Sequence, residues 1–133
     1  MYTHKTELRV RYGETDQMKF VYYGIYAQYF EVGRVELLRS LGITYRELEE
    51  MGFALPVVNY NIDYKKPAFY DDKLTIETSI HEIPKMKIVF NYKTINEKGD
   101  LLNTAETTLV FVDSDTGKPC LPPDILIDKF KEI

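Results

Sequence analysis

One feature limits the fold of this 133-residue chain more than any other: a single helical stripe is followed by four strand-like segments. Over positions 23–42, small and apolar residues recur in steps of three and four, the period of one helix face. The stripe consists of Tyr26, Phe30, Gly33, Leu37 and Leu41, widened by Tyr29 and Leu38. Gly42 then supplies a residue suited to a helix end. We therefore expect one long helix with a broad apolar face to bury. Gly33, inside the stripe, indicates a close approach between that helix and a sheet.

The segments 55–65, 73–81, 87–95 and 101–112 are rich in Val, Ile, Thr, Tyr and Phe, which favours strands. Short turns separate these segments, and their spacing predicts antiparallel meander pairing. Alternation of polar and apolar residues over 6–11 predicts one more strand. A long helix needs a sheet to cover its apolar face. The pattern therefore predicts an α+β fold in which a curved antiparallel sheet wraps around one central helix, as one domain over 1–133.

Two shorter helices complete the expected elements. Thr44 and Glu47 have the spacing of a capping box, which predicts a short helix ending near Gly52. Pro122 and Pro123 suit the first turn of a C-terminal helix.

Composition excludes several classes of function. A net charge of −4 argues against a general nucleic-acid binder, which needs a basic face. Cys120 is the only cysteine, so no disulfide can form within the chain and a reducing compartment fits best. The N-terminal residues lack the apolar core of a signal peptide, and no apolar run approaches the ~18 residues of a membrane span. We expect a cytoplasmic protein.

Other common catalytic devices are also missing. His4 and His81 have no ligand-forming neighbours at useful spacing, and we expect no metal and no other cofactor. The chain has no Gly-x-Ser-x-Gly elbow, which argues against a serine hydrolase.

Asp16 lies in a polar segment, 13–19, just before the expected long helix. A helix N-terminus offers unpaired N–H groups and a partial positive charge, which can polarise a carbonyl and hold an oxyanion. A carboxylate beside it can attack that carbonyl or activate water. This pair suffices for acyl transfer. Spacing alone leaves open a simpler role, because Thr15 or Asp16 could merely cap the helix.

The residues around Asp16 resemble the N-terminal signature of hot-dog-fold 4-hydroxybenzoyl-CoA thioesterase-like proteins. The matching residues are Glu14-Thr15-Asp16, Val21-Tyr22, Tyr26, Phe30-Glu31, Arg34 and Glu36-Leu37-Leu38-Arg39. The similarity continues through Tyr64-Lys65-Lys66-Pro67-Ala68, Asp71-Asp72 and Asn103-Thr104-Ala105-Glu106. It covers nearly the whole chain and implies the hot-dog fold and an acyl-CoA thioesterase.

The resemblance also implies site residues. Asp16 corresponds to the family's nucleophile or general base, and the backbone N–H of Tyr23 to the donor that holds the thioester oxygen. Two positions depart from the family pattern. Lys19 stands where Gly is usual, which bears on the loop path because Gly tolerates backbone conformations that Lys does not. Tyr23 stands where His is common, which removes a possible acid/base partner.

Four further residues are candidates for substrate contacts. Tyr22 and Tyr26 are candidates to line an acyl pocket, although aromatic residues at helical spacing are often core. Lys65 and Lys66 are candidates to meet the phosphates of coenzyme A, although such lysines usually only solvate a surface. On the same helix, Glu31 and Arg34 are expected to form a structural ion pair.

Other functions stay open on the sequence alone. The thioester could be carried by acyl carrier protein instead of coenzyme A, or the chain could be a non-catalytic module that binds acyl-CoA. Hot-dog relatives pair two sheets edge to edge, so we expect a homodimer or a tetramer of dimers.

Overall fold

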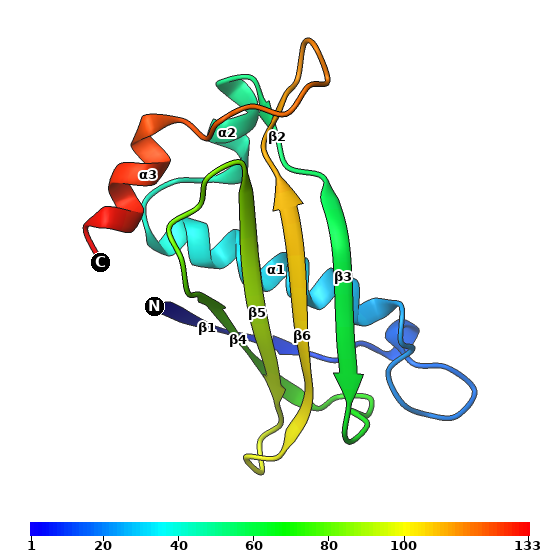
Figure 1. Ribbon diagram of the computed structural model, residues 1–133. Helices are drawn as coiled ribbons and strands as arrows, with labels where there is room; N and C mark the ends of the chain where they lie inside the picture. The colour runs from blue at the N-terminus through cyan, green and yellow to red at the C-terminus, as the bar shows by residue number, and fades with distance from the viewer.

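In the computed structural model, which describes residues 1–133, a five-stranded antiparallel sheet curves around one long helix (Figure 1). The sheet has the order β1-β4-β5-β6-β3. Its strands are β1 (Tyr2–Arg9), β3 (Val57–Tyr64), β4 (Lys73–Ile80), β5 (Lys87–Ile95) and β6 (Leu101–Val110), and the helix is α1 (Ile25–Ser40). The expected α+β hot-dog architecture is confirmed.

The smaller elements lie around this unit. They are the 3-10 turn η1 (Tyr12–Glu14), α2 (Tyr45–Glu50), the strand pair β2 (Phe53–Ala54) and β7 (Val112–Asp113), and α3 (Asp124–Lys131). Thr44 Oγ1 accepts the Glu47 N–H at 3.1 Å, so the predicted cap of α2 is confirmed. The helix α3 starts directly after Pro123, as expected. No helix is both long and apolar enough to span a membrane.

The core lies between α1 and the inner face of the sheet. Phe30 is fully buried, and its ring stacks on that of Tyr92 of β5 with centroids 4.5 Å apart. A Cβ atom at Gly33 would lie 2.5 Å from Thr78 Oγ1 and 2.9 Å from Ile76 Cγ2, both on β4. Such distances leave no room for a methyl group, which confirms that Gly33 permits a close helix–sheet approach.

The strand order corrects one part of the sequence prediction. Strands β4, β5 and β6 form the expected meander, but β3 pairs with β6 and not with β4. The connection 65–72 is too long for a tight hairpin, and it carries the chain from one edge of the sheet towards β1 at the other. Val10 N–H donates to Asp72 O at 2.9 Å at the end of this path. The same connection passes the N-terminal end of α1, where the candidate site lies.

The expected ion pair between Glu31 and Arg34 is wrong. Arg34 is buried, and its Nε–H donates to Tyr45 Oη of α2 at 3.1 Å. Glu31 is exposed and forms no salt bridge. The helix turns the guanidinium inward, so the partner comes from the packed neighbour and not from the same helix.

Candidate active site

Asp16 begins a tight turn between two short antiparallel segments that meet at Thr15 and Val21. The Asp16 N–H donates to Phe20 O at 3.0 Å, and the Lys19 N–H donates to Asp16 O at 2.9 Å. The side chain of Asp16 contributes as well, since its Oδ1 accepts the Met18 N–H at 2.8 Å. Asp residues commonly stabilise turns in this way. The second carboxylate oxygen has no partner within the chain and stays available for chemistry.

Lys19 completes this turn with a left-handed backbone, φ +71°. A turn of this kind ends in a left-handed residue, usually Gly. Lys19 therefore departs from the family pattern in residue type, but it keeps the backbone conformation that Gly favours. The cost of a left-handed non-Gly residue is about 1–2 kcal/mol.

The structure excludes the alternative role of Thr15 or Asp16 as a cap of the long helix. The N-cap of α1 is Gly24, eight positions beyond Asp16. Thr15 Oγ1 donates to Tyr12 O at 2.8 Å within η1. Neither residue caps the long helix, so capping does not explain the Asp16 carboxylate.

Backbone N–H groups without an acceptor lie just before α1. The Tyr22 N–H donates to Glu14 O at 3.0 Å and the Ile25 N–H donates to Tyr22 O at 2.9 Å. Between them, the N–H groups of Tyr23 and Gly24 make no hydrogen bond within the chain. The Tyr23 side chain is 65% exposed and lies against the Tyr22 ring, with centroids 4.6 Å apart. The predicted backbone donor at Tyr23 is thus unpaired.

A groove of about 320 Å³ brings the predicted residues together. It is lined by Asp16, Met18, Phe20, Val21, Tyr23, Tyr26, Tyr64, Lys65, Lys66 and Pro67. Tyr22 is not part of this lining; it is about half-exposed, and its ring packs against that of Tyr23. Tyr64 was not predicted as a site residue, although it directly precedes the two lysines in a stretch that resembles the family.

The aromatic wall of the groove is uncharged near neutral pH. Tyr26 is almost fully buried, and this burial raises its pKa to about 12 although a bond to the Ala68 backbone opposes the shift. The Tyr26 and Tyr64 rings meet edge to face, with centroids 5.8 Å apart. Burial also raises the pKa of Tyr64. These phenols form a mainly apolar surface suited to an acyl group.

The two lysines directly follow strand β3 and line the groove. Both backbone N–H groups donate to Leu102 O of β6, at 2.8 Å for Lys65 and 3.0 Å for Lys66. The Lys66 ammonium also lies 3.7 Å from Asp100 Oδ1, a partly exposed pair of little energetic weight. Lys65 forms no salt bridge.

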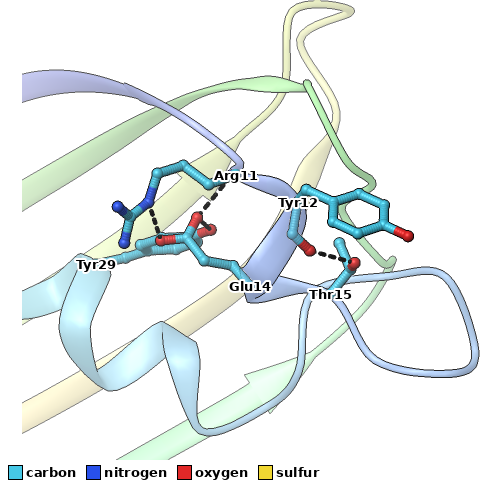
Figure 2. A network of polar contacts seen from close by, with 5 residues as sticks. All are labelled: Arg11, Tyr12, Glu14, Thr15 and Tyr29. Atoms are coloured by element: carbon cyan, nitrogen blue, oxygen red, sulfur yellow. Dashed lines mark hydrogen bonds and ion pairs between the residues drawn. The ribbon is translucent and has the colours of Figure 1, made fainter.

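Behind the turn lies a polar network around Glu14, a residue of the Glu14-Thr15-Asp16 motif (Figure 2). Glu14 is buried, and its Oε1 accepts both the Tyr29 hydroxyl and the Arg11 N–H at 2.8 Å. Its Oε2 accepts the Arg11 Nε–H at 3.2 Å. The signal in the sequence was the acidic residue two positions before Asp16. No cluster of three or more His, Cys, Asp or Glu side chains is placed to hold a metal ion.

A family model described as the thioesterase-like superfamily matches residues 10–130. The chain belongs to the thioesterase-like superfamily. Among its relatives is YneP of Bacillus subtilis, 40% identical over 119 residues, which cover 90% of this chain and 86% of YneP. The acyl-CoA thioester hydrolase YbgC of Escherichia coli O6:H1 is 33% identical over 125 residues, 94% of this chain and 93% of YbgC.

Solved structures agree with this assignment. The crystal structure of a DHNA-CoA thioesterase from Staphylococcus aureus has a TM-score of 0.91 and 36% sequence identity, over 99% of this chain and 88% of that one. The predicted resemblance and the predicted class of enzyme, a thioester hydrolase, are confirmed by the family and these relatives.

Proposed function

We propose that this thioesterase hydrolyses acyl-CoA at the groove beside Asp16, with the Asp16 carboxylate driving the reaction and the Tyr23 N–H holding the oxyanion. One observation carries the proposal: Asp16, whose carboxylate has an oxygen without a partner, and Tyr23, whose backbone N–H has no acceptor within the chain, both line the same groove. Unpaired donors before a helix suit a developing negative charge. The relatives support coenzyme A as the carrier, since both YbgC and the Staphylococcus aureus protein bear CoA thioesters in their names.

The residues can act in a balanced sequence of steps. As a general base, the unpartnered Asp16 oxygen takes a proton from water, and the hydroxide adds to the thioester carbonyl carbon. The carbonyl oxygen becomes an anion that accepts from the Tyr23 N–H. The C–S bond then breaks, the proton on Asp16 passes to the leaving sulfur, and a carboxylic acid and the thiol of coenzyme A are released.

As a nucleophile, the same oxygen adds to the carbonyl itself and the thiolate leaves. Water then hydrolyses the acyl-aspartate anhydride. A single turnover in isotopically labelled water tests the nucleophilic route. Label that enters the Asp16 carboxylate establishes the anhydride, whereas label in the released acid alone fits both routes, because water can add to either carbonyl of the anhydride.

The rest of the groove suits an acyl-CoA thioester. Tyr26 and Tyr64 give the acyl group an apolar wall, while Lys65 and Lys66 place two positive charges at one rim for the phosphates. A narrow rim of charge favours coenzyme A over acyl carrier protein, whose acidic surface calls for a broader basic patch.

We further propose that two copies pair along β3. This edge strand is exposed on nearly its whole length, with four large apolar side chains: Val57, Val58, Tyr60 and Tyr64. An apolar, exposed edge is a site for strand pairing. Because Tyr64 also lines the groove, a partner at this edge would extend the wall of the site.

Asp16→Asn tests the chemistry. Asn keeps the size of the side chain and an oxygen for the Met18 N–H, so the turn should survive while kcat on benzoyl-CoA and hexanoyl-CoA falls by at least ~10²-fold. Asp115→Asn, which alters an exposed carboxylate far along the chain, serves as the matched control and should leave kcat unchanged. Retention of wild-type kcat by Asp16→Asn would remove Asp16 from the reaction.

A further inference from the structure

Glu14 is the only acidic residue that is buried in this molecule, with 8% of its surface exposed, and it lies two positions before Asp16. Burying a carboxylate is costly unless it is hydrogen-bonded or paired. The mechanism proposed above leaves Glu14 without a role. Its contacts therefore need their own explanation.

Three segments converge on Glu14. From the start of η1, just after β1, Arg11 donates through its backbone N–H and its guanidinium. From α1, the buried Tyr29 donates its hydroxyl to Oε1 at 2.8 Å. From the segment just before α1, the Tyr22 N–H donates to the Glu14 backbone oxygen at 3.0 Å. Figure 2 shows the carboxylate of Glu14 between Arg11 and Tyr29.

Through these contacts Glu14 is bonded to both parts of the candidate site, the turn that carries Asp16 and the segment before α1 that carries the Tyr23 N–H. Thr15 and Asp16 follow Glu14 directly, so its side-chain bond to Tyr29 ties the start of the turn to α1. The backbone bond to Tyr22 holds the residue before the unpaired Tyr23 N–H. The tip of the turn has little packing of its own, since Met18 is 66% exposed. The anchor therefore has to come from the base of the turn.

We propose that Glu14 is a positioning residue, held by Tyr29 and Arg11, that sets the Asp16 carboxylate against the Tyr23 N–H. This inference rests on the proposed function. Burial alone would raise the pKa of Glu14, but the bonds from the Arg11 N–H, the Tyr29 hydroxyl and the Arg11 guanidinium outweigh it and lower the pKa. Glu14 is thus an anion at neutral pH, and hydrogen bonds to an anion are stronger and shorter than neutral ones.

Tyr29→Phe tests the anchor with the smallest change. It removes one hydroxyl and leaves Glu14 its contacts to Arg11, so the carboxylate keeps a partner. Misplacement of a catalytic group by about 1 Å can cost ~10²-fold in rate. We expect kcat on benzoyl-CoA and hexanoyl-CoA to fall by about 10- to 10²-fold with KM little changed, because the binding walls are not altered.

Tyr92→Phe is the matched control. Tyr92 is also a buried phenol, whose hydroxyl bonds to Thr107 Oγ1 at 2.6 Å and also contacts the Arg34 side chain, but it belongs to β5 and does not contact the turn. Tyr92→Phe should lose about as much stability in urea as Tyr29→Phe does, while the kcat of Tyr92→Phe stays at the wild-type value. Glu14→Gln is the second test of the anchor and should lower kcat in the same way, because Gln keeps the size but loses the charge.

The variants are then combined with Asp16→Asn and measured in single turnovers at high enzyme concentration. If Tyr29 acts through Asp16, then Tyr29→Phe costs nothing further once Asp16 is changed, since residues that act as a unit are not additive. Three outcomes would overturn the positioning role while leaving the Asp16 chemistry intact. The first is that the effects of Tyr29→Phe and Asp16→Asn on the rate are fully additive. The others are an unchanged kcat in both Tyr29→Phe and Glu14→Gln, or an equal loss of kcat in Tyr92→Phe. Wild-type kcat in Asp16→Asn alone would instead overturn the chemistry, and the positioning role with it.

Discussion

At the scale of single residues, Lys19 carries a conformational cost that the turn around Asp16 imposes. With φ +71° it occupies the left-handed position in which Gly is favoured. Lys19→Gly should relieve the strain and, after the larger chain entropy of unfolded Gly is subtracted, raise the free energy of unfolding by up to about 1 kcal/mol. Urea denaturation measures the change.

A second lysine in a turn provides the comparison. Lys98 is exposed between β5 and β6 and does not have a positive φ. Lys98→Gly should therefore destabilise by about 0.5–1 kcal/mol through chain entropy alone. If both substitutions destabilise equally, the backbone at Lys19 is not left-handed in solution.

The N–H of Tyr23 can be separated from its side chain by two substitutions. Tyr23→Phe keeps the backbone donor and should preserve most of kcat. Tyr23→Pro removes the donor and should lower kcat by about 10²–10³-fold, the loss seen for one oxyanion donor in other acyl-transfer enzymes. Because the Tyr23 N–H makes no hydrogen bond within the chain, Pro breaks no backbone hydrogen bond there, and far-UV circular dichroism should stay unchanged.

The outcome for both variants decides where the donor lies. Equal loss in the two would assign a direct role to the Tyr23 phenol, in place of the family's usual His. If both fold and keep kcat, the oxyanion is held elsewhere, and the Gly24 N–H, which is also unpaired, becomes the next candidate.

At the scale of elements, the contact between α1 and β4 depends on Gly33. Gly33→Ala improves helix propensity by about 1 kcal/mol. The new Cβ would nevertheless lie 2.5 Å from Thr78 Oγ1 and 2.9 Å from Ile76 Cγ2, both in the packed core. Overpacking typically costs about 1–3 kcal/mol, so the net effect should be destabilising by about 1 kcal/mol in urea unfolding.

Gly13→Ala gives a control for this prediction. An added Cβ at Gly13 meets no atom within 4 Å, and its φ is not positive. The substitution should leave stability within about 0.5 kcal/mol of wild type, as surface changes usually do. A stabilised Gly33→Ala variant would show that α1 and β4 are further apart than described.

Much of this element-level arrangement could be predicted from the sequence. Helical spacing gave α1 and its buried face, and residue composition gave four of the five sheet strands within a few positions. Periodicity shows which face of a strand is buried but not which strand lies beside it, so the pairing of β3 with β6 was missed. The partner of Arg34 was missed for a similar reason, because Tyr45 approaches it from α2.

The candidate site could be predicted only in part, because sequence patterns do not show which distant segments lie side by side. The local sequence suggested the Asp16 turn and the Tyr23 amide, since both lie within one short segment. Tyr64 and Pro67 reach the groove only because the connection after β3 passes the N-terminal end of α1. Glu14 gave no signal of burial, because a carboxylate in a polar segment is normally exposed.

At the scale of the whole molecule, the proposed pairing along edge strand β3 can be tested by the mass of the assembly. If two copies pair along β3, light scattering at micromolar concentration should give at least twice the chain mass of 15.6 kDa. Val58 is 54% exposed on this edge and lies outside the core. In a pair of chains joined along β3, Val58→Lys places a charge at the interface of each chain. Charged residues on an edge strand oppose strand pairing. We expect the dissociation constant of the dimer to rise by at least ~10-fold, since burying one unpaired charge costs more than the ~1.4 kcal/mol that corresponds to tenfold.

The same substitution on a different surface isolates the effect of the edge. Val89 is 39% exposed on the central strand β5, away from β3, and Val89→Lys should leave the dimer intact. Because Tyr64 of β3 lines the groove, loss of the partner should also open the wall of the groove. We therefore expect KM for acyl-CoA to rise as Val58→Lys is diluted into monomer. Val89→Lys should keep the wild-type KM. A wild-type protein that is monomeric at micromolar concentration and fully active would refute pairing at β3. An active, dimeric Val58→Lys would place the interface on another face of the sheet.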